Sequence, residues 1–180
     1  MWLLPFLGEK GIALCCERLK HSDAEQRLLA FRALRNAGAD VLPVIRELIS
    51  DPSAAVRREI AIVLHETKCA DKRDLVLQLF TKFTDDSDRH YLEACGMAAE
   101  GIESDVWAEL AKAQPTVLQW PPTFARITWR LLAPAAVPAL RERANSSAPS
   151  AQERQVAFDT LAFIGNKEAV LTIVDIAGGT

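Results

Sequence analysis

Residues 51–64 read Asp-Pro-Ser-Ala-Ala-Val-Arg-Arg-Glu-Ile-Ala-Ile-Val-Leu, and related versions of this stretch recur along the 180-residue chain. Each version has an arginine near the start of a helical pattern, at Arg27, Arg57, Arg89, Arg126 and Arg154. Successive arginines are 30, 32, 37 and 28 residues apart. A period in this range is typical of a repeat array, in which each unit buries its apolar face against its neighbours.

The repeated units read as pairs of helices. Apolar residues recur at helical spacing, as in Val56, Ile60, Val63 and Leu64, and strand-like alternation is absent. Asp51-Pro52 is interpreted as an N-cap followed by proline in the first helical turn. The predicted antiparallel pairs are 9–20 with 22–37, 40–50 with 52–68, 72–84 with 86–100, 103–118 with 122–132, and 135–145 with 150–165, followed by a last helix 167–177.

The sequence therefore predicts an all-α fold, an α-solenoid of antiparallel helix pairs. Its expected units are roughly 9–38, 39–69, 70–101, 102–134 and 135–166, plus the terminal helix, within a single domain 1–180. Proline-rich interruptions at Gln114-Pro115 and Trp120-Pro121-Pro122 make the fourth pair the least regular of the five.

Composition and charge narrow the class of protein. Apolar residues make up 49%, charged residues 25%, and the net charge is −3. Segment 69–110 is acidic and no basic stripe occurs, so nucleic acid is disfavoured as a partner. No apolar run reaches the length of a membrane span, and the apolar start 1–7 lacks the basic region of a signal peptide. The chain as given is therefore expected to be soluble, and it indicates no compartment.

The motif Asp-Pro-x-x-x-Val-Arg-x-x-(Ile/Ala)-Ala at the start of the second helix of a pair resembles the HEAT repeat, most closely at 51–64. A second resemblance covers most of the chain, to the HEAT-repeat region of planctomycete and verrucomicrobial multidomain proteins. These are membrane-bound dehydrogenase-like, c-type haem-binding proteins. The strings that carry this resemblance are Leu28–Leu34, Asp51–Glu59, Lys72–Leu75, Asp88–Gly96, Phe124–Leu131, Pro134–Leu140 and Leu161–Ile164.

In that family the region lies between a β-propeller and a c-type haem domain. The resemblance implies that a parent protein is exported to the periplasm or cell surface. His90 and Cys95 stand where the family has Trp and Leu, so the chain is a divergent relative. The resemblance also implies a structural role for the repeated arginines, each reaching an acidic or carbonyl partner in the adjoining repeat.

No residue cluster indicates catalysis or a cofactor. Cys15, Cys16, Cys69 and Cys95 form no Cys-x-x-Cys motif, and no nucleophile–base pair is implied. His65 and Cys69 are four residues apart, with Asp71 beyond, but two or three such residues make a weak metal signal. The cluster 85–88 resembles a calcium loop without its glycine and terminal glutamate, so it is expected to cap the helix beginning near Asp88. We expect no catalytic residue, metal or cofactor.

A partner-binding surface is predicted on the second helices, which line the concave side of such a solenoid. Opposite the core face of 52–68 lie Arg58, Ile62 and His65, 100° per residue around the helix. When the same positions are counted from the repeated arginine of each unit, they define a concave stripe along the array. Its residues are Arg32, Arg35, Arg58, Ile62, His65, His90, Met97, Ile127 and Leu131. The stripe begins basic and becomes apolar, and Ile62, Met97, Ile127 and Leu131 are expected to be exposed on it. Burial of Ile62 and Leu131 would contradict this expectation.

These features favour a non-catalytic scaffold that binds a protein or a neighbouring domain of a parent chain. One alternative is a HEAT-like DNA-binding, alkylpurine DNA glycosylase-type enzyme, for which Arg32, Arg35, Arg58 and His65 provide basic groups. Another is a chromophore- or haem-handling solenoid that uses the apolar stripe as a pocket. The final helix 167–177 has little polar surface and no partner helix after it, which predicts self-association or a covering neighbour at this end.

Overall fold

The computed structural model describes residues 8–114 and 116–179, and within these ranges every regular element is a helix. The apolar start 1–7 lies outside the described residues. The helices are α1 Glu9–Arg18, α2 Ala24–Asn36, α3 Leu42–Leu48, α4 Ala54–Glu66, α5 Lys72–Thr81, α6 Arg89–Ala98, α7 Glu103–Ala111, α8 Pro122–Leu131, α9 Val137–Asn145, α10 Ala151–Ile164 and α11 Lys167–Gly178, with the short 3-10 helices η2 Val117–Gln119 and η3 Pro134–Ala136. The expected all-α solenoid is confirmed.

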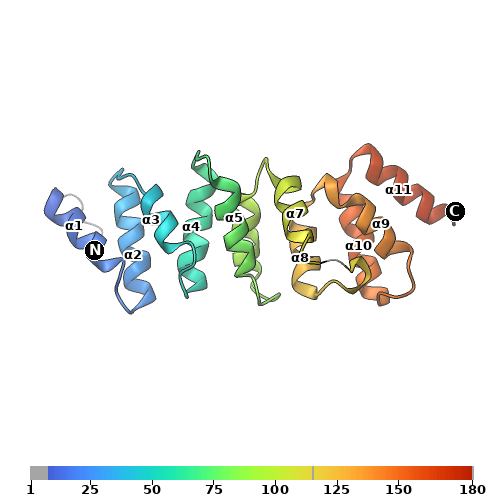
Figure 1. Ribbon diagram of the computed structural model, residues 1–180, viewed down its shortest axis with the longest axis horizontal. Coiled ribbons are helices and arrows are strands. Elements are labelled where there is room, and N and C mark those ends of the chain that lie inside the picture. Colours follow the sequence, from blue (N-terminus) through green and yellow to red (C-terminus); the bar gives the residue numbers. More distant parts are fainter. Residues whose placement is uncertain (1–7, 115, 180) are drawn as a thin grey trace.

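The helices stack side by side along the long axis of the molecule, with the two ends of the chain at opposite ends of the stack (Figure 1). Each odd-numbered helix from α1 to α9 packs on the helix that follows it. The second helices α2, α4, α6, α8 and α10 also pack on one another in order, and α11 packs on both α9 and α10. One apolar core runs between the two layers from Cys15 to Ala169. None of the described helices is long and apolar enough to cross a membrane.

Local polar contacts set where the second helices begin. Asp88 caps α6 by accepting a hydrogen bond from the Tyr91 amide at 3.0 Å, so the expected capping role of this acidic cluster is confirmed. Ser150 and Glu153 form a reciprocal capping box at α10. The prediction that Asp51 is an N-cap is wrong, because α4 begins after Ser53 and the Asp51 carboxylate bonds a neighbouring arginine instead.

The fourth pair is shorter than predicted. The expected helix 103–118 ends at Ala111, and the chain continues through a turn and η2 to Trp120. Trp120 packs edge-on against Phe124, with ring centroids 4.9 Å apart, and both rings contact Trp107. This aromatic cluster fills the space that a longer α7 would have occupied, and the buried Arg143 guanidinium lies 4.8 Å above the Trp120 ring.

Candidate partner-binding face

Three of the five repeated arginines occupy one structural position, the fourth residue after an N-cap. Arg27 follows Asp23, Arg57 follows Ser53, and Arg154 follows Ser150. At this position the guanidinium turns back to the loop that precedes its own helix. The Nη1 group of each arginine donates to a carbonyl five residues earlier, at Ser22, Pro52 and Pro149 respectively, over 2.9, 3.0 and 2.6 Å.

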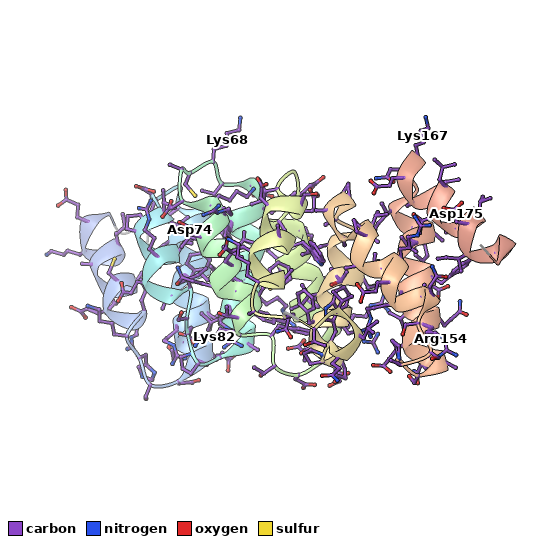
Figure 2. The ribbon with its side chains drawn as sticks, turned by 45° about the vertical axis from the view of Figure 1, so that its right-hand side comes forward. Lys68, Asp74, Lys82, Arg154, Lys167 and Asp175 are labelled. Carbon is purple, nitrogen blue, oxygen red and sulfur yellow. The ribbon has the colours of Figure 1, made fainter. Side chains whose placement is uncertain are left out.

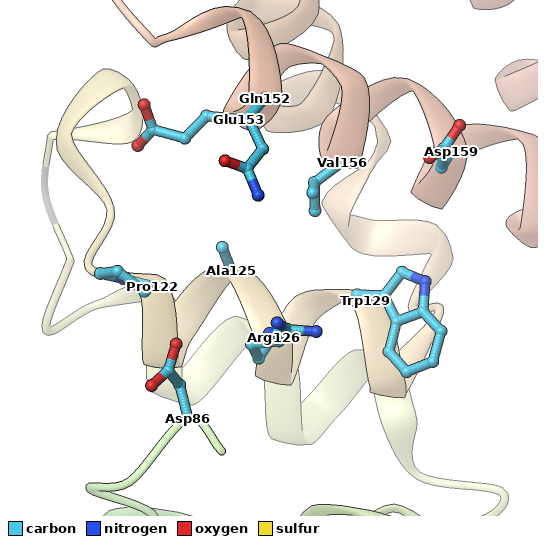
Figure 3. A pocket seen from close by; sticks show the side chains of 9 residues that line it. All are labelled: Asp86, Pro122, Ala125, Arg126, Trp129, Gln152, Glu153, Val156 and Asp159. Carbon is cyan, nitrogen blue, oxygen red and sulfur yellow. The ribbon is translucent and has the colours of Figure 1, made fainter. Parts of the chain in front are cut away.

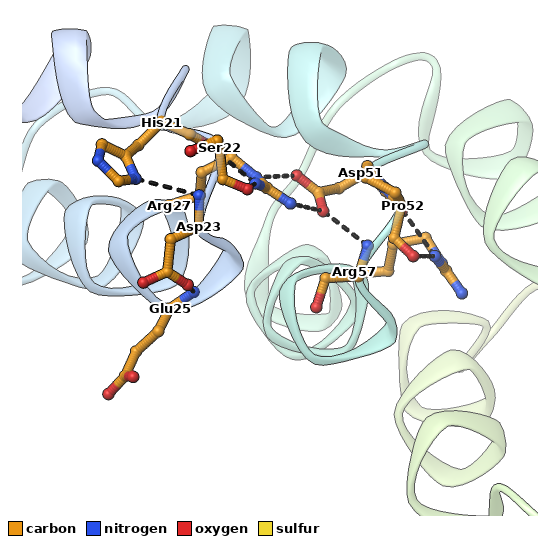
Figure 4. A network of polar contacts seen from close by, with 9 residues as sticks. His21, Ser22, Asp23, Glu25, Arg27, Asp51, Pro52 and Arg57 are labelled. Carbon is orange, nitrogen blue, oxygen red and sulfur yellow. Dashed lines mark hydrogen bonds and ion pairs between the residues drawn. The ribbon is translucent and has the colours of Figure 1, made fainter.

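Arg27 and Arg57 extend this bonding into the next pair, as Figure 4 shows for the first step. The buried Arg27 guanidinium donates to both carboxylate oxygens of Asp51 at 2.7 Å, and Arg57 donates to the Asp51 carbonyl at 2.6 Å. Arg57 also donates to the Tyr91 hydroxyl at 3.2 Å, and that hydroxyl donates to the Leu79 carbonyl at 2.7 Å. These bonds connect three successive pairs through the interior.

Burial alone would raise the pKa of Asp51, yet the hydrogen bonds from Arg27 and the Ser53 amide, with the charges of Arg27 and Arg57, lower it overall. Burial raises the pKa of the Tyr91 hydroxyl, which therefore stays protonated and able to donate. The arginines thus hold a buried carboxylate in its charged form and order the loops between pairs.

Arg89 and Arg126 do not share this position. Arg89 is the first residue of α6 after Asp88, and Arg126 is the fifth residue after the α8 N-cap Pro121. Both side chains are exposed. The arginine register therefore slips in the third and fourth pairs, where helix starts set by Asp88 and by Pro121-Pro122 define the true alignment. The sequence predicted the start of α8 at residue 122 correctly, and counting from that start instead of from Arg126 would have given the true alignment.

The expected exposure of Ile127 and Leu131 is wrong, since these side chains are only 5% and 3% exposed. A shift of one residue turns a helix position by about 100°. With α8 beginning at Pro122, this rotation turns Ile127 and Leu131 into the core and places Arg126 and Arg130 at the outward positions. Ile62 is half-buried, so the apolar patch expected on the second helices does not form as a continuous strip.

Counting from the N-caps defines the face that the second helices present, here called the second-helix face. Its members are the fifth, ninth and twelfth residues of these helices: Leu28, Arg32 and Arg35 on α2; Arg58, Ile62 and His65 on α4; Glu93, Met97 and Glu100 from α6 onward; Arg126 and Arg130 on α8; Gln155, Asp159 and Ala162 on α10. Met97 is 40% exposed on this face. His90, at the second position of α6, is exposed beside it.

Most charges on this face are paired between neighbouring helices. Arg32 donates to Glu59 at 2.8 Å, and Arg35 contacts both Glu59 and Glu66, at 3.7 and 3.1 Å. The His65 Nδ1 group lies 2.8 Å from the Met97 carbonyl oxygen and 3.4 Å from Glu100.

Arg130 on α8 donates to Glu93 on α6 at 2.6 Å. Two cations on the face, Arg58 and Arg126, have no hydrogen bond or ion pair with any residue in 8–114 or 116–179. The basic start of the face is therefore largely neutralised by contacts within the fold.

A pocket of about 470 Å³ opens between α8 and α10 (Figure 3). Its lining residues are Asp86, Pro122, Ala125, Arg126, Trp129, Gln152, Glu153, Val156 and Asp159. Ala125 and Val156 face each other across the opening, and Trp129 lies at one end (Figure 3). Within the described ranges, no hydrogen bond or ion pair joins α8 to α10, whereas α4 and α6 are joined by those of Arg57 and His65. No polar contact of the described residues therefore closes the space between these two helices.

The pocket combines an apolar floor with a charged rim. The rim has three carboxylates and one guanidinium, a net charge of about −2 when all are ionised. Glu153 is held by Ser150 and lies 3.5 Å from Arg143, and Asp159 accepts a bond from Gln155 at 2.7 Å. Arg126 and Asp86 have no such partner in the part of the chain that the structure describes. The pocket is therefore suited to an apolar side chain flanked by a cation.

The metal signal from the sequence is not supported by the geometry. Cys69 lies three residues beyond the end of α4, so it does not share a helix face with His65 as the predicted helix 52–68 required. Asp71 is engaged by Arg46 through two hydrogen bonds, at 2.8 and 3.1 Å. Across residues 8–114 and 116–179, no group of three or more His, Cys, Asp or Glu side chains is placed to hold a metal ion.

Comparison with known proteins supports the repeat assignment for part of the chain. Residues 12–99 match the family model for HEAT repeats, just under half of the chain, from within α1 to the end of α6. This match supports a HEAT-repeat relationship for the first three pairs. No curated protein and no solved structure gives a significant match.

Proposed function

We propose that the whole chain is a HEAT-type array that serves as a non-catalytic scaffold, and that it binds a protein partner on the second-helix face. The observation that carries this proposal is the pocket between α8 and α10, with an apolar floor and a rim of net negative charge. Pockets on proteins that place apolar walls beside a few charged groups are the usual sites for side chains of a partner. The net negative rim favours a partner segment that carries a basic residue beside an apolar one.

The chemistry of the potential nucleophiles supports a non-catalytic role. Burial raises the pKa of the Cys95 thiol to about 12, and it also raises the pKa values of Cys15 and Cys69. Thiols with raised pKa values are protonated near neutral pH and react poorly. His65 is bonded to the Met97 carbonyl instead of facing a nucleophile.

A protein partner is favoured over DNA because most basic groups of the second-helix face are paired with carboxylates of the chain itself. Of the four basic groups that suggested a DNA channel, Arg32, Arg35 and His65 contact Glu59, Glu66 or Glu100. Of these four groups, only Arg58 has no hydrogen bond or ion pair with another described residue. Salt-dependent binding to duplex DNA would support the glycosylase-type alternative, and visible absorbance of the purified protein would support the haem or chromophore alternative.

The resemblance to the HEAT region of dehydrogenase-like haem proteins adds a finer proposal, that the partner is a neighbouring domain of one larger redox protein. Reading the flanking coding sequence tests it. A β-propeller upstream and a Cys-x-x-Cys-His motif downstream would support an interdomain scaffold, and their absence would contradict it.

Site-specific photo-crosslinking tests the binding face directly. A photoreactive phenylalanine analogue replaces Gln152, which is exposed at the pocket, or Gln78, which is exposed on α5 in the other layer. In an extract of the cells that naturally make the protein, we expect a specific adduct from position 152 and none from position 78.

The adduct should be lost in an Asp86→Lys variant, because a basic partner segment is then repelled, and kept in Asp74→Lys, a matched charge reversal at an exposed site on α5. The identified partner should then bind the purified chain with the same dependence on Asp86. Equal labelling from both positions, or equal loss with both charge reversals, would count against a binding role for this face.

A further inference from the structure

The last helix, α11, exposes a group of large apolar side chains. Val170, Leu171 and Val174 on α11 are 49%, 53% and 60% exposed, and Phe163 near the end of α10 is 66% exposed. These are four of the six large apolar side chains that the structure shows as exposed in the ranges 8–114 and 116–179. The exposed positions of α5 and α9 carry polar groups such as Arg73, Asp74, Arg141 and Glu142.

The apolar residues of α11 form a single stripe bordered by opposite charges. Val170, Leu171 and Val174 lie on one side of the helix because they are spaced one and four residues apart. Ala169 and Thr172 are the positions buried against the preceding pair, so the stripe faces away from it. Lys167 and Asp175 lie four residues before and four residues after Leu171 (Figure 2).

We propose that two copies of this chain pair through α11, with the two helices antiparallel and related by a two-fold axis at Leu171. A two-fold contact requires a surface that complements itself, and this stripe does so in two respects. Its apolar centre meets an identical centre, and Lys167 of one copy lies opposite Asp175 of the second copy. Asp175 also accepts a hydrogen bond from Arg141 at 3.1 Å.

The size of the apolar patch sets the expected affinity of the dimer. One short helix and one aromatic ring bury less than the roughly 1,200 Å² in total at which stable interfaces begin. We therefore expect a reversible dimer with a Kd on the order of 10–100 µM, exchanging quickly with monomer. The second-helix face stays open in such a pair, so this proposal stands independently of the proposed function.

Sedimentation velocity of the purified chain between about 1 and 500 µM, a range chosen to bracket this affinity, tests the pairing. We expect wild type to shift from monomer to dimer over this range and Leu171→Glu to remain monomeric. The control Met97→Glu, at an exposed apolar site on α6, should dimerise as wild type does. Lys167→Glu should weaken the dimer several-fold at low salt, with Lys68→Glu, exposed in the α4–α5 loop, as its control.

Circular dichroism of the monomeric variants checks that they fold, which is expected because Leu171 and Lys167 are exposed. A carbodiimide cross-link in a mixture of isotopically heavy and light copies provides the second readout. A heavy–light link between Lys167 and Asp175 joins two different copies, because each copy is either entirely heavy or entirely light. A monomer at every concentration, or equal effects of Leu171→Glu and Met97→Glu, would overturn the proposal and leave α11 to a different occupant.

Discussion

Replacing Arg27 by methionine should be among the most damaging single substitutions in this chain. The Arg27 and Asp51 side chains are 10% and 3% exposed, and the guanidinium donates two parallel hydrogen bonds to the carboxylate. Methionine fills a similar volume but leaves the Asp51 carboxylate buried without its cation. The carbonyls of His21 and Ser22 lose their donor as well.

The loss of stability expected for Arg27→Met follows from the burial of the ion pair. Removing one partner of a buried, hydrogen-bonded ion pair costs about 3–5 kcal/mol, mostly because the remaining charge stays desolvated. For a chain of 180 residues, each kcal/mol shifts the midpoint of thermal unfolding by about 2–4 °C. We therefore expect Arg27→Met to lower Tm by roughly 6–20 °C. Converting Asp51 to leucine in the same chain should recover much of the loss, because no charge is then buried.

Urea unfolding followed by circular dichroism at 222 nm measures the effect, with Arg46→Met as the matched control. Arg46 makes the same two-bond contact with Asp71, but these side chains are 48% and 38% exposed. Exposed pairs are screened by water, so the control should unfold close to wild type. If Arg27→Met and Arg46→Met lose equal stability, burial does not determine the strength of these pairs and the reasoning fails.

Three further predictions concern other contacts. The hydrogen bonds from Arg46 lower the pKa of Asp71 to about 2, so the contribution of this pair is present above the unfolded-state pKa of about 3.9 and is lost as the pH falls towards 2. Because both side chains are exposed, this contribution is small, and the urea midpoint should drop only slightly less across this window in Asp71→Asn than in wild type. At Gly96 an added Cβ would lie 2.5 Å from the Nε atom of Arg130, so Gly96→Ala should destabilise wild type by displacing that guanidinium. In an Arg130→Ala background the same substitution should stabilise the fold by up to about 1 kcal/mol, because alanine favours the helix over glycine. A stability change of the same sign in both backgrounds would contradict the contact. Arg143 is 1% exposed and donates to the Val117 carbonyl at 2.6 Å, so Arg143→Met should lower the free energy of unfolding by about 1–3 kcal/mol. It should also change the tryptophan fluorescence, because the guanidinium lies over the Trp120 ring. An unchanged spectrum would argue against this packing.

The helices were predictable because their signals are local. Apolar spacing, caps and Pro or Gly at the joints depend on a few neighbouring residues, and the predicted pairs lie within a few residues of the observed ones outside the α7–α8 connection. That connection was missed because the aromatic cluster of Trp107, Trp120 and Phe124 joins residues from separate elements. Apolar periodicity carries no information about such contacts.

The positions on the second-helix face could be predicted only where the repeated arginine lies at the same distance from the N-cap. Arg32, Arg35, Arg58 and Ile62 lie on this face because α2 and α4 share that distance, and binding of a partner there stays a prediction. In α8 the arginine is one position later, which sends Ile127 and Leu131 into the core. The pocket between α8 and α10 was not foreseen, because it is lined by residues from two helices that face each other.

The sequence by itself determined the helical class, the repeat and the approximate places of the helices, because each depends on patterns within a single turn or period. Tertiary structure decided which apolar residues are buried. Leu131 and Leu171 both follow helical apolar patterns, yet Leu131 is 3% exposed and Leu171 is 53% exposed. The difference is that helices pack over one side of α8 that contains Leu131, whereas no described helix of this chain covers the Leu171 side of α11. Burial is a property of the neighbours as well as of the residue, and a single helix does not encode its neighbours.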